Sequence, residues 1–96
     1  MEGKYVIVRS NGSGCWAGTL QKRDGAEVIL TDARRLWYWS GAASLSELAM
    51  KGTSKPNQCK FPMPVNEVLV MNVIEIIPTQ KKAEESIREV RAWTEH

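Results

Sequence analysis

Histidine is almost missing from this sequence, and so are the side-chain clusters on which most enzymes depend. The only histidine is the last residue, His96, and chain ends are commonly poorly ordered. The two cysteines, Cys15 and Cys59, lie far apart, lack metal-ligand spacing and have no nearby histidine to activate them. We therefore expect free thiols and a protein that is not an enzyme, with no catalytic residue, no metal ion and no cofactor.

Long hydrophobic runs are missing as well. No stretch approaches the roughly 20 apolar residues that cross a bilayer, and Met1–Tyr5 lacks the apolar segment of a secretion signal. The 13 basic and 11 acidic residues give a net charge of +2, which is too weak for a protein that coats DNA. We expect one cytoplasmic domain over residues 1–96, without a membrane or a long nucleic acid as partner.

The first third of the chain favours a three-stranded antiparallel meander. The expected strands are Lys4–Arg9, Cys15–Arg23 and Glu27–Thr31, the last running on into an aromatic stretch. Ser10–Gly14 joins the first two strands, either as a tight connection or as a nest of backbone N–H groups for an anion. The Asp24-Gly25 pair is typical of a hairpin turn.

Two helices are expected. Ser44 and Glu47 match a capping box that starts a short helix ending near Lys51, with Gly52 as its stop. Thr79 is the expected N-cap of the C-terminal helix. Its packing face is Ala83, Ile87, Val90 and Thr94, and Glu84 with Arg88 makes an i,i+4 pair.

Between the helices, Val65–Ile77 is expected to form one long buried strand. Both of its faces are apolar, so we expect a second copy of the chain to cover one of them. Asn72 is the one polar residue on its face and serves either as a structural hydrogen-bonding group or as a contact to a polar ligand edge. The fold class is therefore α+β: a small antiparallel sheet (meander plus long buried strand), a short helix and a C-terminal helix, in a homo-oligomer.

The segment Ala33–Leu45 carries the functional signal. Its adjacent Arg34 and Arg35 suit phosphate, because a guanidinium donates paired hydrogen bonds. The ring run Trp37–Trp39 suits nucleobases, which stack on aromatic faces. The alternative is a strand whose rings are core and whose arginines are solvated. Phe61, in the proline-rich loop Thr53–Pro64, is either a core residue or a stacking platform.

The sequence resembles a family of phage anti-Thoeris proteins, the first type of Thoeris anti-defence protein. The central block ARRLWYWSGAASLSELAMKG (33–52) is the most specific part of the match. Further matching segments are Arg9, Cys15–Gly18, Cys59–Pro62, EIIPTQKKAEESI (75–87) and Val90–Trp93.

That resemblance implies a sponge for glycocyclic ADP-ribose, the cyclic ADP-ribose isomer that a TIR-domain defence enzyme makes. Such a protein holds the signal without degrading it, in the cytoplasm of the infected bacterial host. Some members also hold cyclic di- or trinucleotides, which extends the expectation to CBASS-type defence. Their pockets lie between subunits, so the resemblance implies a homodimer or a higher oligomer such as a hexamer.

The resemblance also assigns roles to single residues. Arg35, with Arg34 as its alternate, would clamp the diphosphate. Phe61 and Arg88 would sandwich the adenine. The remaining assigned residues are Asn72, at a polar edge of the ligand, and Arg9, from the partner chain. Whether Trp37, Tyr38 and Trp39 touch the ligand or only build the core stays open.

Two other functions compete with sequestration. A hydrolase of the same signal would release a product of changed mass. A small module for single-stranded nucleic acid would also use basic and aromatic strand residues, and its affinity would fall steeply with salt.

Overall fold

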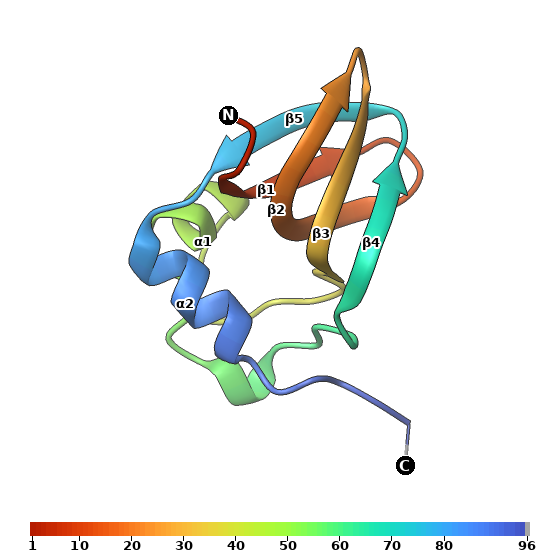
Figure 1. Cartoon of the computed structure of the whole chain (residues 1–96). Helices are drawn as coiled ribbons and strands as arrows, with labels where there is room; N and C mark the ends of the chain where they lie inside the picture. The colour runs from red at the N-terminus through yellow and green to blue at the C-terminus, as the bar shows by residue number, and fades with distance from the viewer. Residues whose placement is uncertain (96) are drawn as a thin grey trace.

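The computed structural model describes residues 1–95 as a single curved antiparallel sheet with two helices packed beside it (Figure 1). Its elements are β1 (Tyr5–Ser10), β2 (Gly14–Asp24), β3 (Glu27–Arg35), α1 (Leu45–Lys51), a 3-10 turn η1 (Pro56–Gln58), β4 (Val65–Val70), β5 (Val73–Pro78) and α2 (Lys81–Glu89). The predicted α+β class and the β1–β2–β3 meander are confirmed. No helix in the described part of the chain is long and apolar enough to span a membrane.

Strand β1 is the centre of the fold, because both of its faces are covered. The five strands pair in the order β4-β3-β2-β1-β5, and the four residues Tyr5–Val8 are all buried. Side chains of a strand alternate between its faces. Val6 and Val8 therefore pack inside the curve of the sheet with Leu30 and Val70, while alternate residues of β1 face the helices.

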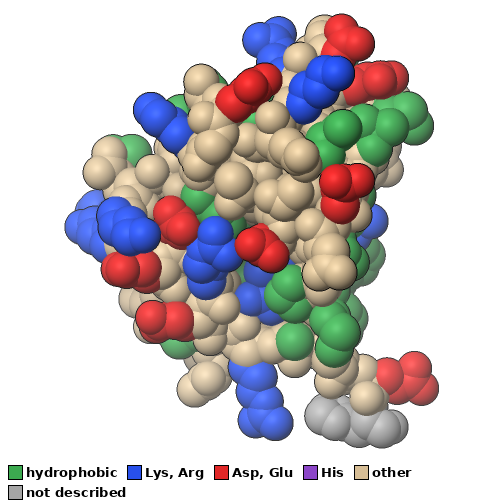
Figure 2. Space-filling view, viewed as in Figure 1, with side chains coloured by type: hydrophobic (Ala, Val, Ile, Leu, Met, Phe, Trp, Pro, Cys, Tyr) green, Lys and Arg blue, Asp and Glu red, His purple; other side chains and the backbone are tan. Residues whose placement is uncertain are grey.

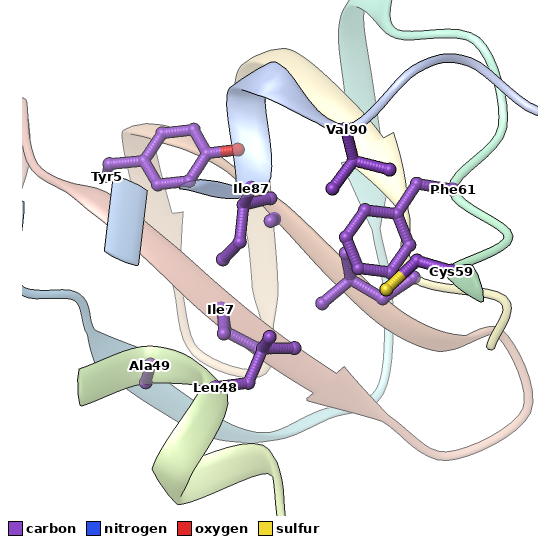
Figure 3. Packing of buried hydrophobic residues seen from close by; sticks show 10 residues of the cluster. Tyr5, Ile7, Leu48, Ala49, Cys59, Phe61, Ile87 and Val90 are labelled. Atoms are coloured by element: carbon purple, nitrogen blue, oxygen red, sulfur yellow. The ribbon is translucent and has the colours of Figure 1, made fainter. Parts of the chain in front are cut away.

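The second core lies between the sheet and the helices (Figure 3). The Phe61 ring packs there beside Val90 and Cys59 and is 0% exposed. Ile87 of α2 and Leu48 of α1 complete the same cluster. The loop Thr53–Pro64 thus sends its phenylalanine into the core, as one of the two interpretations of the sequence expected.

The expected single strand Val65–Ile77 is wrong. The chain breaks at Met71-Asn72 into β4 and β5, which lie at opposite edges of the curved sheet. Asn72 adopts a φ of 57°, a left-handed conformation that asparagine tolerates better than most residues. Its carbonyl accepts a hydrogen bond from the Asn11 backbone N–H at 2.9 Å. A two-faced apolar pattern therefore marks two half-buried strands instead of one buried strand.

The helix boundaries follow local chemistry. The Ser44 hydroxyl accepts from the Glu47 N–H at 3.1 Å, and α1 ends at Gly52, both as predicted. The C-terminal helix differs at its start, because its N-cap is Gln80. Thr79 instead donates its hydroxyl to the Tyr5 carbonyl at 2.8 Å, which joins β5 to β1.

The packing face of α2 is shorter than expected. Ala83 and Ile87 are fully buried, and Val90 is buried directly after the helix. Thr94 lies beyond the helix and is exposed. The helix therefore ends before the last position of the predicted face.

Candidate functional site

A bulge in β3 separates the two central arginines. The β2–β3 register shifts between Ala17 and Thr19, where β3 holds one extra residue, and Asp32 there has a φ of 47°. A bulge of this kind re-aims the side chains that follow it. Consecutive strand residues point to opposite faces, so Arg34 turns toward α2 and Arg35 turns away from it.

Arg35 is held by β2 and by the loop that precedes β2. Its guanidinium carbon lies 4.2 Å from the centroid of the Trp16 ring, and Trp16 is its register partner on β2. One terminal nitrogen also donates to the Ser13 carbonyl. The side chain is half-buried, so the cation is oriented by the protein but still reaches solvent.

Arg35 lines a hollow of about 370 Å³. We call this cavity the Arg35 hollow; its lining residues are Gly12, Ser13, Gly14, Cys15, Arg35, Leu36, Trp37 and Trp39. Trp37 is 64% exposed and Trp39 is half-buried. Tyr38, between them, pairs by its backbone with Lys60 and is absent from the lining, as expected when alternate side chains of an extended segment point to opposite sides.

The loop beside the hollow is a tight connection and not an open anion nest. The Ser13 N–H donates to the Ser10 hydroxyl at 3.2 Å, and the Asn11 N–H donates to the Asn72 carbonyl at 2.9 Å. Asn72 therefore supports this loop through its backbone. Arg9 is exposed nearby on β1, and its Nε lies 3.0 Å from the Glu75 carboxylate.

Arg34 serves the fold. It is 3% exposed, and its guanidinium donates to the carbonyls of Phe61, Pro62, Ile87 and Val90 at 2.8–3.3 Å. Burial lowers the pKa of this guanidinium from its usual value. Because all its N–H groups are directed at backbone carbonyls, Arg34 has no donor left for a diphosphate. Its expected role as the alternate clamp therefore finds no support in this geometry.

Phe61 and Arg88 do not form the expected sandwich. Phe61 has no exposed ring face, because the ring fills the core between β3 and α2. Arg88 lies instead 4.4 Å over the Tyr5 ring, and its Nε pairs with the Glu84 carboxylate at 2.9 Å. This Glu84–Arg88 pair is the i,i+4 interaction predicted from the sequence.

Two aromatic residues that contact the candidate arginines are identified only by the structure. Trp16 lies in the expected strand Cys15–Arg23, but its position beneath Arg35 depends on the β2–β3 register. The sequence places Tyr5 only in the first expected strand, whereas in the structure the Arg88 guanidinium lies over the Tyr5 ring. The sequence places both aromatic residues on expected strands, but the Trp16–Arg35 pair depends on the bulged β2–β3 register and the Tyr5–Arg88 pair depends on the packing of α2 against β1.

The Arg35 hollow contains few reactive groups. It offers one guanidinium, two indole faces and the thiol of Cys15, whose pKa is raised by burial despite the nearby charge of Arg9. A neutral thiol is a poor nucleophile at neutral pH. Within residues 1–95, no three His, Cys, Asp or Glu side chains come together to hold a metal ion.

The comparisons with known proteins identify a family but no activity. Neither a curated protein nor a solved structure matches the chain significantly. A family model described as a domain of unknown function (DUF6948) matches residues 3–87. The chain therefore belongs to the DUF6948 family.

Proposed function

We propose that this protein binds a small cyclic nucleotide signal of the glycocyclic ADP-ribose type and sequesters it without breaking a bond. Its place of action would be the cytoplasm of a phage-infected bacterium, where it would block Thoeris-type defence. One observation carries the proposal: the oriented Arg35 guanidinium lies in a hollow that Trp37 and Trp39 border.

The hollow suits both chemical parts of a nucleotide. Arg35 has one recorded hydrogen bond, to the Ser13 carbonyl, so its other N–H groups are available to a diphosphate. The exposed Trp37 ring offers a face on which a purine can stack. The cavity of about 370 Å³ lies within the roughly 300–1,000 Å³ typical of small-molecule sites. Cyclic di- and trinucleotides carry the same groups and belong to the proposed ligand class.

The lining residues favour binding over hydrolysis. General acid–base catalysis needs a positioned proton acceptor near the reacting bond, and no Asp, Glu or His lines the Arg35 hollow. Its strongest polar group is a permanent cation, which stabilises a diphosphate without taking a proton from water. We therefore propose sequestration in preference to a hydrolase.

The flank of β4 supports the accompanying proposal that the chain self-associates. Hydrophobic side chains gather on this side of the molecule in the space-filling view (Figure 2). Val65, Leu69 and Met71 are 42–54% exposed there. Strand β4 pairs only with β3, so its other edge has no strand partner within residues 1–95. An exposed apolar edge of this kind favours pairing with a second copy in a homodimer or a larger assembly.

Calorimetric titration with glycocyclic ADP-ribose tests the proposed function. We expect saturable binding by the native chain and a loss of at least tenfold for Arg35→Ala, because a hydrogen bond to a charged group contributes about 1.5–3 kcal/mol. Arg23→Ala is the matched control. It removes the same charge seven residues along β2 from Trp16, the register partner of Arg35, or about 23 Å of strand at roughly 3.3 Å per residue.

The same titration separates the competing functions. A single-stranded oligonucleotide that binds more tightly than the cyclic nucleotide, with a steep dependence on salt, would favour the nucleic-acid module. Equal affinity of Arg35→Ala and the native chain would remove the Arg35 hollow from the site. Continuous heat release after saturation would indicate turnover and thus a hydrolase.

A further inference from the structure

A second recess lies on the other side of β3 from the Arg35 hollow. Its volume is about 280 Å³, and its lining residues are Tyr5, Asp32, Arg34, Pro64 and Arg88. These residues come from β1, from the β3 bulge, from the segment before β4 and from the last turn of α2. The recess shares no lining residue with the Arg35 hollow.

Tyr5 places an unpaired hydroxyl at this recess. The residue is only 5% exposed, its hydroxyl makes no hydrogen bond to a group within residues 1–95, and the hydroxyl oxygen reaches the surface at the recess. Burial raises the pKa of this phenol to about 12, although the charges of Arg88 and Arg34 oppose the shift. The hydroxyl therefore keeps its proton at neutral pH and can donate it in a hydrogen bond.

Arg88 supplies a second unused donor beside the first. Its Nε is paired with Glu84, and one terminal nitrogen approaches the Thr19 hydroxyl at 3.5 Å. The other terminal nitrogen has no recorded partner in the described chain. Arg34 adds positive charge from below, but its donors are already used. The recess thus combines a phenol donor and a guanidinium donor, and the charges of Arg34 and Arg88 are balanced there by Asp32 and by Glu84, the partner of Arg88.

Asp32 adds an acceptor at the same recess. Its carboxylate makes no ion pair with Arg88, whose partner within residues 1–95 is Glu84. It sits on the bulge at a φ of 47°, a conformation uncommon for a residue with a side chain. Two donors and one acceptor at the same recess match a phosphate ester that also carries hydroxyl groups.

We propose that this recess is a separate binding site for the phosphate of a sugar phosphate, with Tyr5 and Arg88 as donors to the phosphate and Asp32 as acceptor from a sugar hydroxyl. The size of the recess is slightly below that of typical small-molecule sites, so it suits one sugar phosphate unit and not a whole dinucleotide. Nothing in this inference depends on the Arg35 hollow.

NMR titration of the protein with labelled tyrosine rings tests the site. The chain has two tyrosines, so Tyr38→Phe leaves Tyr5 as the only ring signal. We expect ribose 5-phosphate to shift this signal with saturation, inorganic phosphate to bind more weakly, and ribose alone to have no effect. No saturable shift with ribose 5-phosphate would overturn the proposal.

Substitutions then separate this site from the proposed function. Tyr5→Phe keeps the ring under Arg88 and removes only the hydroxyl. We expect it to weaken ribose 5-phosphate binding at least tenfold, followed at the Arg88 side-chain nitrogen, because a hydrogen bond to a charged group contributes about 1.5–3 kcal/mol. Unchanged affinity would show that the hydroxyl takes no part. Arg35→Ala should leave ribose 5-phosphate binding intact. The two proposed sites can therefore be confirmed or refuted independently of each other.

Discussion

The Arg35 guanidinium lies 4.2 Å over the Trp16 ring, across a register pair of β2 and β3. A cation in this position gains about 0.5–2 kcal/mol from the ring. The stacking also fixes the direction of the side chain before a ligand arrives, which reduces the entropy lost on binding. The hollow beside Arg35 therefore contains a pre-oriented cation and two further indole rings, and the first prediction concerns those rings.

Trp37→Ala should weaken the binding of a cyclic nucleotide with little effect on stability. The ring is 64% exposed, and base stacking contributes about 1–3 kcal/mol, or roughly 5- to 150-fold in affinity. Calorimetry measures the affinity, and thermal unfolding checks the fold. Tyr38→Ala is the matched control, since this ring points away from the hollow. Equal effects of the two substitutions would contradict base stacking on Trp37.

Arg34→Lys should destabilise the fold. A lysine cannot reproduce the fork that joins carbonyls of the loop and of α2, and buried carbonyls would lose their partners. We expect a loss of about 3 kcal/mol in urea unfolding, since each hydrogen bond to a charged group is worth roughly 1.5–3 kcal/mol. A variant as stable as the native chain would show that these bonds contribute little.

Substitutions of Phe61 distinguish a role in core packing from a role in stacking on the ligand. Phe61→Ala should cost about 3–5 kcal/mol of stability by leaving a cavity, while Phe61→Leu should cost about 1.5 kcal/mol or less if the core repacks. The leucine variant, once shown to be folded, should bind the ligand normally. If it is folded but has lost binding, Phe61 stacks on the base after all.

Tyr5 should make stability depend on pH in the alkaline range. Its pKa is about 12 in the folded chain against an ordinary tyrosine value of 10.0, so the unfolded chain loses the proton first. Stability is then unaffected below pH 10 and falls as the pH rises from 10 toward 12.

The size of this effect can be measured against a matched variant. By pH 11 the phenol should remove roughly 1.4 kcal/mol from the free energy of unfolding. Urea unfolding of the native chain and of Tyr5→Phe at pH 9 and pH 11 isolates this contribution. Parallel losses in both proteins would mean that Tyr5 titrates normally.

Leu69→Glu tests self-association through the β4 flank. Leu69 is 54% exposed on β4, and a charge there should disfavour an apolar interface while sparing the fold. Sedimentation should show smaller particles for this variant than for the native chain. Met50→Glu, at a 48% exposed position on α1, is the control and should not change the assembly. A native chain that sediments as a monomer would end this part of the proposal.

Local signals in the sequence predicted the elements that depend on neighbouring residues. The Ser44–Glu47 capping box fixed the start of α1, and the spacing of Ala83 and Ile87 gave the buried face of α2. The break at Asn72 was missed because an apolar pattern on both faces fits one buried strand as well as two half-buried ones. The only local signal of the break in the sequence was Asn72 itself, because asparagine adopts the left-handed backbone conformation more readily than most residues.

The candidate site could be predicted only in part. The residue types of Ala33–Leu45 pointed to Arg35 and to the rings beside it. Arg34 is buried and Arg35 borders the hollow because of a one-residue bulge at Asp32. Two adjacent arginines in a sequence do not show which of them faces the core. Long-range pairs such as Tyr5 with Arg88 depend on how α2 packs against β1.

Mass spectrometry of the small molecules carried by the purified protein tests the central claim most directly. The native chain, Arg23→Ala and Arg35→Ala would each be purified from cells in which a TIR enzyme makes its signal, and then denatured by heat. We expect the first two to release glycocyclic ADP-ribose of unchanged mass and Arg35→Ala to release almost none. A cleaved product, or an equal load on all three proteins, would contradict sequestration by the Arg35 hollow.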